Sequence, residues 1–423
     1  MTQSWTTLDH SHVWHPYTQH GTALPPIPVA RAEGAYLYDT DGRAILDAIS
    51  SWWVTIHGHA HPVIAEAIAA QARRLEQVIF AGFTHEPAAR LAAELAAVLP
   101  GQLTRVFFSD DGSTAVEVAI KIALQLGWNR GLRRPVIAAL ENAYHGDTFG
   151  AMSVSGRGLF TDPFSEHLFD VARLPDPTEG DTAGALARLL EERGEDIAAV
   201  IVEPLLLGAG GMRVWSRETL RQIRTLTREH DVLLIADEVL TGFGRTGPLF
   251  ACDGAGVEPD IICLSKGLTG GFLPLGATAV REEIFEAFRS DDRRRTLFHG
   301  HSYTANPLAC AAARASLRLL LEDGAADRRE AIERAHRDNM PRVAGHPRVR
   351  NPRVLGTVAA FDLHAGDGYL SPIGQELQTF ALREGVLLRP LGNVVYVLPP
   401  YCVTPEEIGS IYDVVLRFLA RHG

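Results

Sequence analysis

The chain has 423 residues, of which 46% are hydrophobic and 22% are charged, close to the averages of globular proteins. This composition excludes a wholly disordered chain and a fibrous repeat. The net charge of −11 argues against a general nucleic-acid binder, since such proteins carry clustered positive charge. At about 150 residues per domain, the length predicts two or three domains.

No apolar run approaches the roughly 20 residues that cross a bilayer, and residues 1–19 lack a basic segment followed by an apolar one. Four cysteines are too few for a disulfide scaffold in a chain of this length, and no two of them form a C-x-x-C pair. We therefore expect a cytosolic protein with no membrane or nucleic-acid partner. Its cysteines are expected to be reduced packing residues: Cys252, Cys263, Cys310 and Cys402.

Residues 36–48 predict a β-hairpin that turns at Asp41-Gly42. Beyond residue 56, short and continuously apolar segments alternate with helical patterns. The segments are predicted strands at 106–109, 136–140, 198–203, 232–237 and 261–265, and the clearest helices are at 113–126 and 216–230, the second with Ser216 as N-cap. Strands that alternate with helices predict an α/β fold with a mainly parallel sheet covered on both faces.

The pattern changes after residue 305. Two long helices are followed by a strand at 356–363, a helix near 372–384 and two short strands before residue 401. Because neither chain end has the alternating pattern, we expect residues 1–55 and 305–423 to form a smaller α+β domain. Residues 56–304 would form the large α/β domain.

Ligands of open α/β sheets bind at the carboxyl ends of the strands, so the residues that follow each apolar segment are candidates for a site. Lys266 follows one such strand, where burial would lower the pKa of its amine and favour imine formation. Asp237 ends another, and a buried carboxylate requires a cationic partner such as a protonated pyridine nitrogen. Taken alone, Lys266 could be an ordinary lysine at the end of a strand, and Asp237 could only accept hydrogen bonds from neighbouring backbone amides. Together they indicate pyridoxal phosphate chemistry.

Gly112 and Ser113 open a helix directly after a strand, where free N–H groups and the positive helix end favour a phosphate. Tyr144 follows the next strand and offers a flat ring for stacking. Each signal is weak alone, because the first could be only a helix cap and the second only a packing aromatic.

Four segments in this order resemble the class III pyridoxal-phosphate-dependent aminotransferases of fold type I: 112–121, 141–148, 235–247 and 260–268. The resemblance implies that pyridoxal 5′-phosphate is bound covalently by Lys266, with Asp237 as the partner of its pyridinium. It further implies that Gly112 and Ser113 hold the phosphate, that Tyr144 lies over the ring, and that Glu203 lies near it.

Segments 14–19, 50–62 and 387–401 resemble the branch of this family that acts in biotin synthesis. That resemblance implies S-adenosylmethionine as the small-molecule amino donor and the keto acid 8-amino-7-oxononanoate as the acceptor, which becomes 7,8-diaminononanoate. The implied catalytic residues are Lys266, Asp237 and Tyr17, and the implied substrate contacts are Tyr17, Trp52, Trp53, Tyr144, Lys266, Gly300 and Arg389. Arg389 would bind the carboxylate of the acceptor.

Gly300, His301 and Ser302 match a loop that in the family reaches the cofactor phosphate and the substrate of the neighbouring subunit. This match implies a homodimer with shared active sites. Some family members have Pro-Thr in place of His301-Ser302, and the serine keeps a hydroxyl for the phosphate.

Residues 242–247 match G-x-G-x-x-G, the pattern of dinucleotide-binding oxidoreductases. Pro248 follows with no helical run, and position 267 is glycine where that fold requires an acid. The pattern therefore disfavours this class and leaves Arg245 as a charge of the site or an anchor of the loop.

His57, His59 and His61 alternate, which would allow metal ligation from one face of an extended segment. Because Pro62 and a helical run follow at once, His61 is better interpreted as a helix-entry residue and no metal is expected. Two other functions stay open: another class III ω-aminotransferase acting on ornithine, 4-aminobutyrate, lysine or a β-amino acid, and a non-catalytic protein that binds the cofactor.

Overall fold

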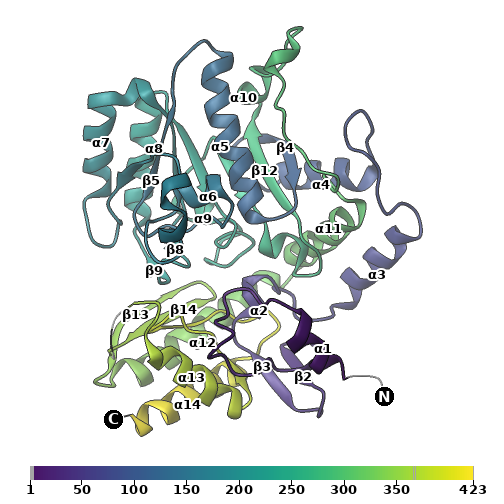
Figure 1. The fold of residues 1–423 in the computed structure, drawn as a ribbon, viewed down its shortest axis with the longest axis vertical. Coiled ribbons are helices and arrows are strands. Elements are labelled where there is room, and N and C mark those ends of the chain that lie inside the picture. The colour runs from purple at the N-terminus through teal and green to yellow at the C-terminus, as the bar shows by residue number, and fades with distance from the viewer. Residues whose placement is uncertain (1–3, 365, 367, 423) are drawn as a thin grey trace.

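The computed structural model describes residues 4–364, 366 and 368–422. Figure 1 shows a larger upper part and a smaller lower part, and both chain ends lie in the lower part. The larger part is built on a seven-stranded sheet. Its strands, in spatial order, are β4 (Leu103–Ser109), β12 (Gly276–Arg281), β11 (Ile261–Leu264), β10 (Leu233–Asp237), β7 (Ile197–Val202), β5 (Val136–Leu140) and β6 (Ala172–Leu174).

Strands β11, β10, β7, β5 and β6 are parallel to one another, so the predicted mainly parallel sheet is confirmed. β12 is antiparallel to both β11 and β4 and was missed in the sequence. Its residues GATAVR begin with small side chains, which give no apolar run of the kind that predicts a buried strand.

The sheet is covered by helices on both faces, which explains why the central strands β5, β7, β10 and β11 are apolar up to their carboxyl ends. Ile137 and Ala139 of β5 pack in one cluster with α5 (Gly112–Asn129), whereas Ala138 and Leu140 pack in another with α7 (Thr182–Arg193) and α8 (Arg217–Glu229). The helix at 216–230 was predicted correctly, and its N-cap Ser216 accepts from the Thr219 amide. The other helices of this part are α3 (Pro62–Ala72), α4 (Glu86–Ala96), α6 (Phe149–Val154), α9 (Ala251–Ala255), α10 (Glu282–Glu286) and α11 (Pro307–Leu321).

The smaller part combines both ends of the chain. In one sheet β1 (Val29–Glu33), β2 (Tyr36–Asp39) and β3 (Ala44–Asp47) are antiparallel, and β15 (Val386–Leu387) pairs in parallel with β3. The predicted hairpin at Asp41-Gly42 is confirmed, since it joins β2 to β3. A second sheet contains β13 (Val349–Leu355), β14 (Val358–Leu363) and β16 (Val394–Val397).

The remaining helices are α1 (Trp5–His12), α2 (Ser50–Trp53), α12 (Ala325–Ala344), α13 (Pro372–Arg383) and α14 (Pro405–Arg421), and a separate hairpin is formed by β8 (Leu206–Leu207) and β9 (Arg213–Val214). α11 follows residue 305 but packs against α3 and α4. The division of the chain at residues 55 and 304 stays a prediction.

The cysteines only partly follow the expectation. Cys252, Cys263 and Cys310 are buried and unpaired, as expected of packing residues, but Cys402 is exposed. Along the described part of the chain, no helix is both long and apolar enough to cross a membrane.

Candidate active site

The carboxyl ends of the central strands open onto one cavity of about 570 Å³. Asp237 ends β10, Lys266 follows β11, and Glu203 follows β7. These three side chains line the cavity together with the start of α5 and the loop after β5, which contains Tyr144. Parallel strands that end at one edge of the sheet bring these distant residues together.

Lys266 begins a short 3-10 helix, Lys266–Thr269, and has a φ of +43°. Positive φ strains a residue other than glycine by about 1–3 kcal/mol, and such residues cluster at functional sites. Burial lowers the pKa of the amine, although the nearby carboxylates of Asp237 and Glu203 oppose the shift. A larger share of neutral amine makes the lysine a better nucleophile. Its Nζ lies 4.8 Å from the centre of the Trp53 ring.

Asp237 is held in place by His145. The His145 Nδ1–H donates to Oδ2 of Asp237 at 2.6 Å, and the Val239 amide donates to Oδ1 at 3.1 Å. Both side chains are buried. His145 was missed as a site residue, although it follows Tyr144 in the segment 141–148. A strand-end histidine next to a predicted aromatic is the signal that could have identified it.

The start of α5 supplies the anion site. The Asp111 carboxylate accepts from the Thr114 amide at 2.7 Å, and the Thr114 hydroxyl accepts from the Asp111 amide at 3.0 Å. This capping box leaves the amides of Gly112 and Ser113 without an acceptor among the described residues, and both residues line the cavity. A Cβ on Gly112 would lie 2.6 Å from Cγ1 of Val239, so only glycine fits there.

Two of the predicted cofactor contacts have further roles in the single chain. The Ser113 Oγ lies 2.7 Å from the Thr148 Oγ1, so this hydroxyl holds the loop after β5 as well as facing the cavity. Glu203 accepts from the amides of Tyr144 at 2.8 Å and Gly208 at 3.0 Å. Burial raises the pKa of Glu203 to about 7, so this carboxyl is partly protonated near neutral pH.

The predicted substrate residues Tyr17, Trp52 and Arg389 meet beside the cavity and are not part of its lining, but Tyr17 contacts the lining residues Tyr144 and Asp147. The Tyr17 hydroxyl donates to Asp147 at 2.6 Å and lies 3.3 Å from the Tyr144 hydroxyl. Its ring meets the Trp52 ring edge-on at 5.4 Å, and the Arg389 guanidinium lies 4.7 Å from the centre of the same indole. The rings of Tyr17 and Trp52 therefore form an aromatic wall, and the Arg389 guanidinium lies over the Trp52 indole.

Other aromatic residues belong to this wall or stand behind it. Trp53 is buried and donates its Nε1–H to the Tyr396 hydroxyl at 3.0 Å. Phe160 lies 5.8 Å from Tyr17, and Tyr369 lies 4.8 Å from Phe160, measured between ring centres. Phe160 and Tyr369 were missed because they come from loops with no local motif.

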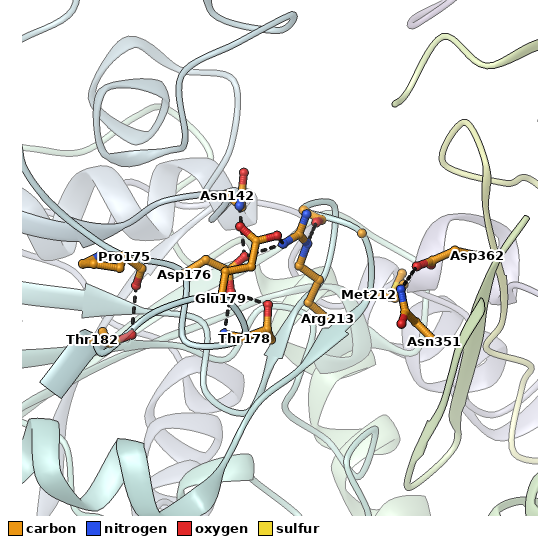
Figure 2. Close-up of polar contacts among 12 residues, drawn as sticks. Asn142, Pro175, Asp176, Thr178, Glu179, Thr182, Met212, Arg213, Asn351 and Asp362 are labelled. Carbon is orange, nitrogen blue, oxygen red and sulfur yellow. Dashed lines mark hydrogen bonds and ion pairs between the residues drawn. The ribbon is translucent and has the colours of Figure 1, made fainter. Parts of the chain in front are cut away.

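Figure 2 shows the polar contacts that hold the base of the loop after β5. Asn142 and Arg213 donate to the same oxygen of Asp176, at 3.0 Å and 2.9 Å. The other oxygen of Asp176 accepts from the amide and the hydroxyl of Thr178, and Arg213 also pairs with Glu179. Because Asp176 is buried, this network fixes the loops after β5 and β6 and the β8–β9 hairpin relative to one another.

Gly300, His301 and Ser302 do not line the cavity of their own chain. The Nε2 of His301 lies 3.8 Å from the Asp110 carboxylate, and the carbonyl of the exposed Ser302 accepts from Gln77 at 2.6 Å. A single chain therefore leaves this loop beside its cavity rather than inside it.

The two rival motifs have structural roles. Arg245 is buried and donates to the carbonyl oxygens of Pro399 at 2.9 Å and Trp53 at 3.1 Å, so it anchors the 242–247 loop. His57 contacts Ser316, His59 contacts Asp47, and His61 is the N-cap residue of α3 as predicted. Within the described residues, no group of three or more histidines, cysteines or acids could hold a metal ion.

The sheet, the buried lysine and aspartate at its strand ends, and the free helix N-terminus define a pyridoxal-phosphate transferase of fold type I. The amine, the carboxylate and the anion site fit the aldehyde, the pyridine nitrogen and the phosphate of that cofactor. The family model of the class III aminotransferases matches residues 17–419, and the chain belongs to this family, whose members depend on pyridoxal phosphate.

The chain is 53% identical to the adenosylmethionine-8-amino-7-oxononanoate aminotransferase of Synechococcus elongatus over 420 residues, which cover 97% of this chain and 99% of that protein. It is 42% identical to the protein of the same name from Nitratidesulfovibrio vulgaris, covering 97% of this chain and 80% of that protein. The crystal structure of the enzyme of that name from Methanocaldococcus jannaschii superposes with a TM-score of 0.93 at 34% identity, covering 99% of this chain and 98% of that chain.

Proposed function

We propose that the protein transfers the amino group of S-adenosylmethionine to 8-amino-7-oxononanoate, giving 7,8-diaminononanoate for biotin synthesis. The observation that carries the proposal is the Arg389 guanidinium, which lies 4.7 Å from the centre of the Trp52 ring, next to Tyr17, whose hydroxyl lies 3.3 Å from that of Tyr144 in the lining of the lysine cavity. The names of the relatives at 53% and 42% identity support it.

When bound, pyridoxal phosphate supplies the electron sink that stabilises negative charge on the reacting carbon. Lys266 would hold the cofactor, and its free amine would move the proton of the reacting carbon as general base and acid. Asp237 keeps the ring nitrogen protonated, and His145 orients Asp237. The amides of Gly112 and Ser113 would hold the phosphate, and Tyr144 would pack against the ring.

The acceptor is a long aliphatic chain that ends in a carboxylate, so its site requires apolar walls and a distant cation. Trp52 and Tyr17 supply walls with polar tips. Arg389 is suited to hold the carboxylate through paired N–H groups. Reaction with the two substrates in turn on one lysine follows the ping-pong pattern of covalent catalysis.

We further propose that two chains share each site and that the enzyme works in the cytoplasm. Phe298 and Tyr303, on either side of the 300–302 loop, are 74% and 65% exposed. Such large exposed fractions of two aromatic rings, next to a predicted cofactor contact, favour the burial of these rings against a second copy of the chain.

The direct test supplies the purified holoenzyme with S-adenosylmethionine and 8-amino-7-oxononanoate and measures the diamine by mass spectrometry. We expect the diamine to form with the enzyme and not with a Lys266→Ala control. If lysine, ornithine or 4-aminobutyrate supports turnover of another keto acid while the diamine never forms, the protein is a different ω-aminotransferase and the proposal is wrong.

A further inference from the structure

A second cavity, of about 880 Å³, lies between the N-terminal strands and the junction of α11 with α12. Its walls come from residues 31–34 and 57–62, from the end of α11 and the start of α12, and from residues 401–402. It shares no lining residue with the cavity around Lys266. None of the proposed catalytic residues faces it.

An unpaired guanidinium is buried in the wall of this second cavity. Arg329 is only 8% exposed, and its Nη1 donates to the Ala325 carbonyl at 3.1 Å. Its Nε has no hydrogen-bond acceptor, and within the described residues neither Arg329 nor its neighbour Arg328 forms an ion pair. A buried cation without a counter-charge is costly, and burial lowers the pKa of Arg329.

A second buried guanidinium lies close by. The Cζ atoms of Arg245 and Arg329 lie 5.1 Å and 6.0 Å from the centre of the Tyr401 ring, and Tyr401 lines the cavity. Arg245 is held by two backbone carbonyls and forms no ion pair with a described carboxylate. Two positive charges, those of Arg245 and Arg329, therefore lie close to the ring of Tyr401.

The charges on the cavity wall leave an excess of positive charge. Arg31 pairs with Glu33 at 3.4 Å, so Glu322 is the remaining carboxylate of the lining against Arg328 and Arg329, and Glu330 acts on Arg329 from outside the lining. The N-terminal end of α12, which begins at Ala325, adds partial positive charge.

Histidines add neutral hydrogen-bonding groups to the same wall. Burial, followed by the proximity of His61, lowers the pKa of His57 to about 3, so its ring is neutral at pH 7. The Nδ1 of His61 is buried without a partner among the described residues.

We propose that this cavity binds a small organic anion whose carboxylate or phosphate oxygens contact Arg328 and Arg329 at the start of α12. Paired N–H groups of arginine match such oxyanions. The cavity falls within the size range of pockets for small molecules.

Citrate and inorganic phosphate are suitable probes, titrated into the holoenzyme by calorimetry at constant ionic strength with sodium chloride as the balancing salt. We expect saturable citrate binding that Arg328→Gln weakens by about tenfold or more. Glu322→Gln is expected to tighten it, which a damaged fold would not do. Arg342→Gln is the matched control, because Arg342 is an exposed residue of α12 that pairs with Asp413 outside the cavity.

An Arg389→Ala variant separates this cavity from the active site, where a carboxylate could also bind. We expect citrate to bind that variant with unchanged affinity. The proposal is overturned if no saturable binding occurs, if Arg328→Gln and Glu322→Gln leave the affinity unchanged, or if Arg389→Ala alone abolishes it. If phosphate binds saturably as well as citrate, the cavity recognises the oxyanion itself. If only citrate binds saturably, the cavity also requires the organic part of the anion.

Discussion

Lys266 combines a strand-end position, an amine of lowered pKa and an adjacent buried carboxylate. Lys266→Ala removes the group that both holds the cofactor and moves the proton, so we expect turnover to fall by roughly 10²–10⁴-fold or more. Borohydride reduction of the wild-type holoenzyme should fix the cofactor on Lys266, as read by peptide mapping. A reduced adduct mapped to any other lysine contradicts the assignment.

Arg389 is the residue that we expect to bind the carboxylate of the acceptor. Arg389→Ala removes charged hydrogen bonds to the acceptor carboxylate, each worth about 1.5–3 kcal/mol, and should raise the KM of the acceptor roughly 10- to 100-fold. The donor half-reaction should change much less, because the donor does not require that contact. Steady-state kinetics with each substrate varied in turn checks this, and equal losses for both substrates would rule the role out.

At the scale of elements, the Asp176 network holds the loop that contains Tyr144 and His145. Asp176→Ala should leave Asn142 and Arg213 unpaired and loosen this loop, lowering kcat about tenfold or more and shifting the visible absorbance of the bound cofactor. Glu179→Gln is the control, since the exposed Glu179 side chain also pairs with Arg213 but its replacement leaves the bonds of Asp176 to Asn142 and Arg213 in place. A loss of stability with kcat and absorbance unchanged would show that the network does not position the site.

A buried histidine between α12 and α14, His336, which contacts the Tyr412 hydroxyl, should make stability depend on pH. Burial lowers the pKa of His336 to about 4 from an ordinary value of 6.5, so the unfolded chain binds a proton there between pH 6.5 and 4 that the folded chain does not. Stability should therefore fall as the pH drops through this range. His336→Phe should reduce the fall in the unfolding midpoint between pH 7 and pH 5, whereas the exposed His10→Asn should not. An identical fall in all three proteins refutes this.

The elements also show what could be predicted from the sequence. Lys266 and Asp237 were predictable, because a continuously apolar strand locates its own carboxyl end and parallel strands share one edge. β12 was not, because its small residues give no apolar run. Phe160 and Tyr369 were not either, since their contacts with Tyr17 depend on how distant loops fold together.

At the scale of the whole molecule, the 300–302 loop predicts a dimer with shared sites. Chains with Lys266→Ala retain Ser302, and chains with Ser302→Ala retain Lys266. If Ser302 serves the site of the other chain, a dimer of one chain of each variant contains one site with both Lys266 and Ser302. Co-expression of the two weakly active variants should then restore activity. Activity measured after co-expression, with the dimer verified by ultracentrifugation, checks this. No gain over the separate variants would mean that each chain completes its own site.

We propose that this aminotransferase takes its amino group from S-adenosylmethionine. The most direct measurement follows the visible absorbance of the lysine-bound cofactor when the holoenzyme is mixed, without acceptor, with S-adenosylmethionine, lysine, ornithine or 4-aminobutyrate. We expect S-adenosylmethionine to bleach this band and 8-amino-7-oxononanoate then to restore it. Bleaching by a simple ω-amine alone, with no response to S-adenosylmethionine, would contradict it.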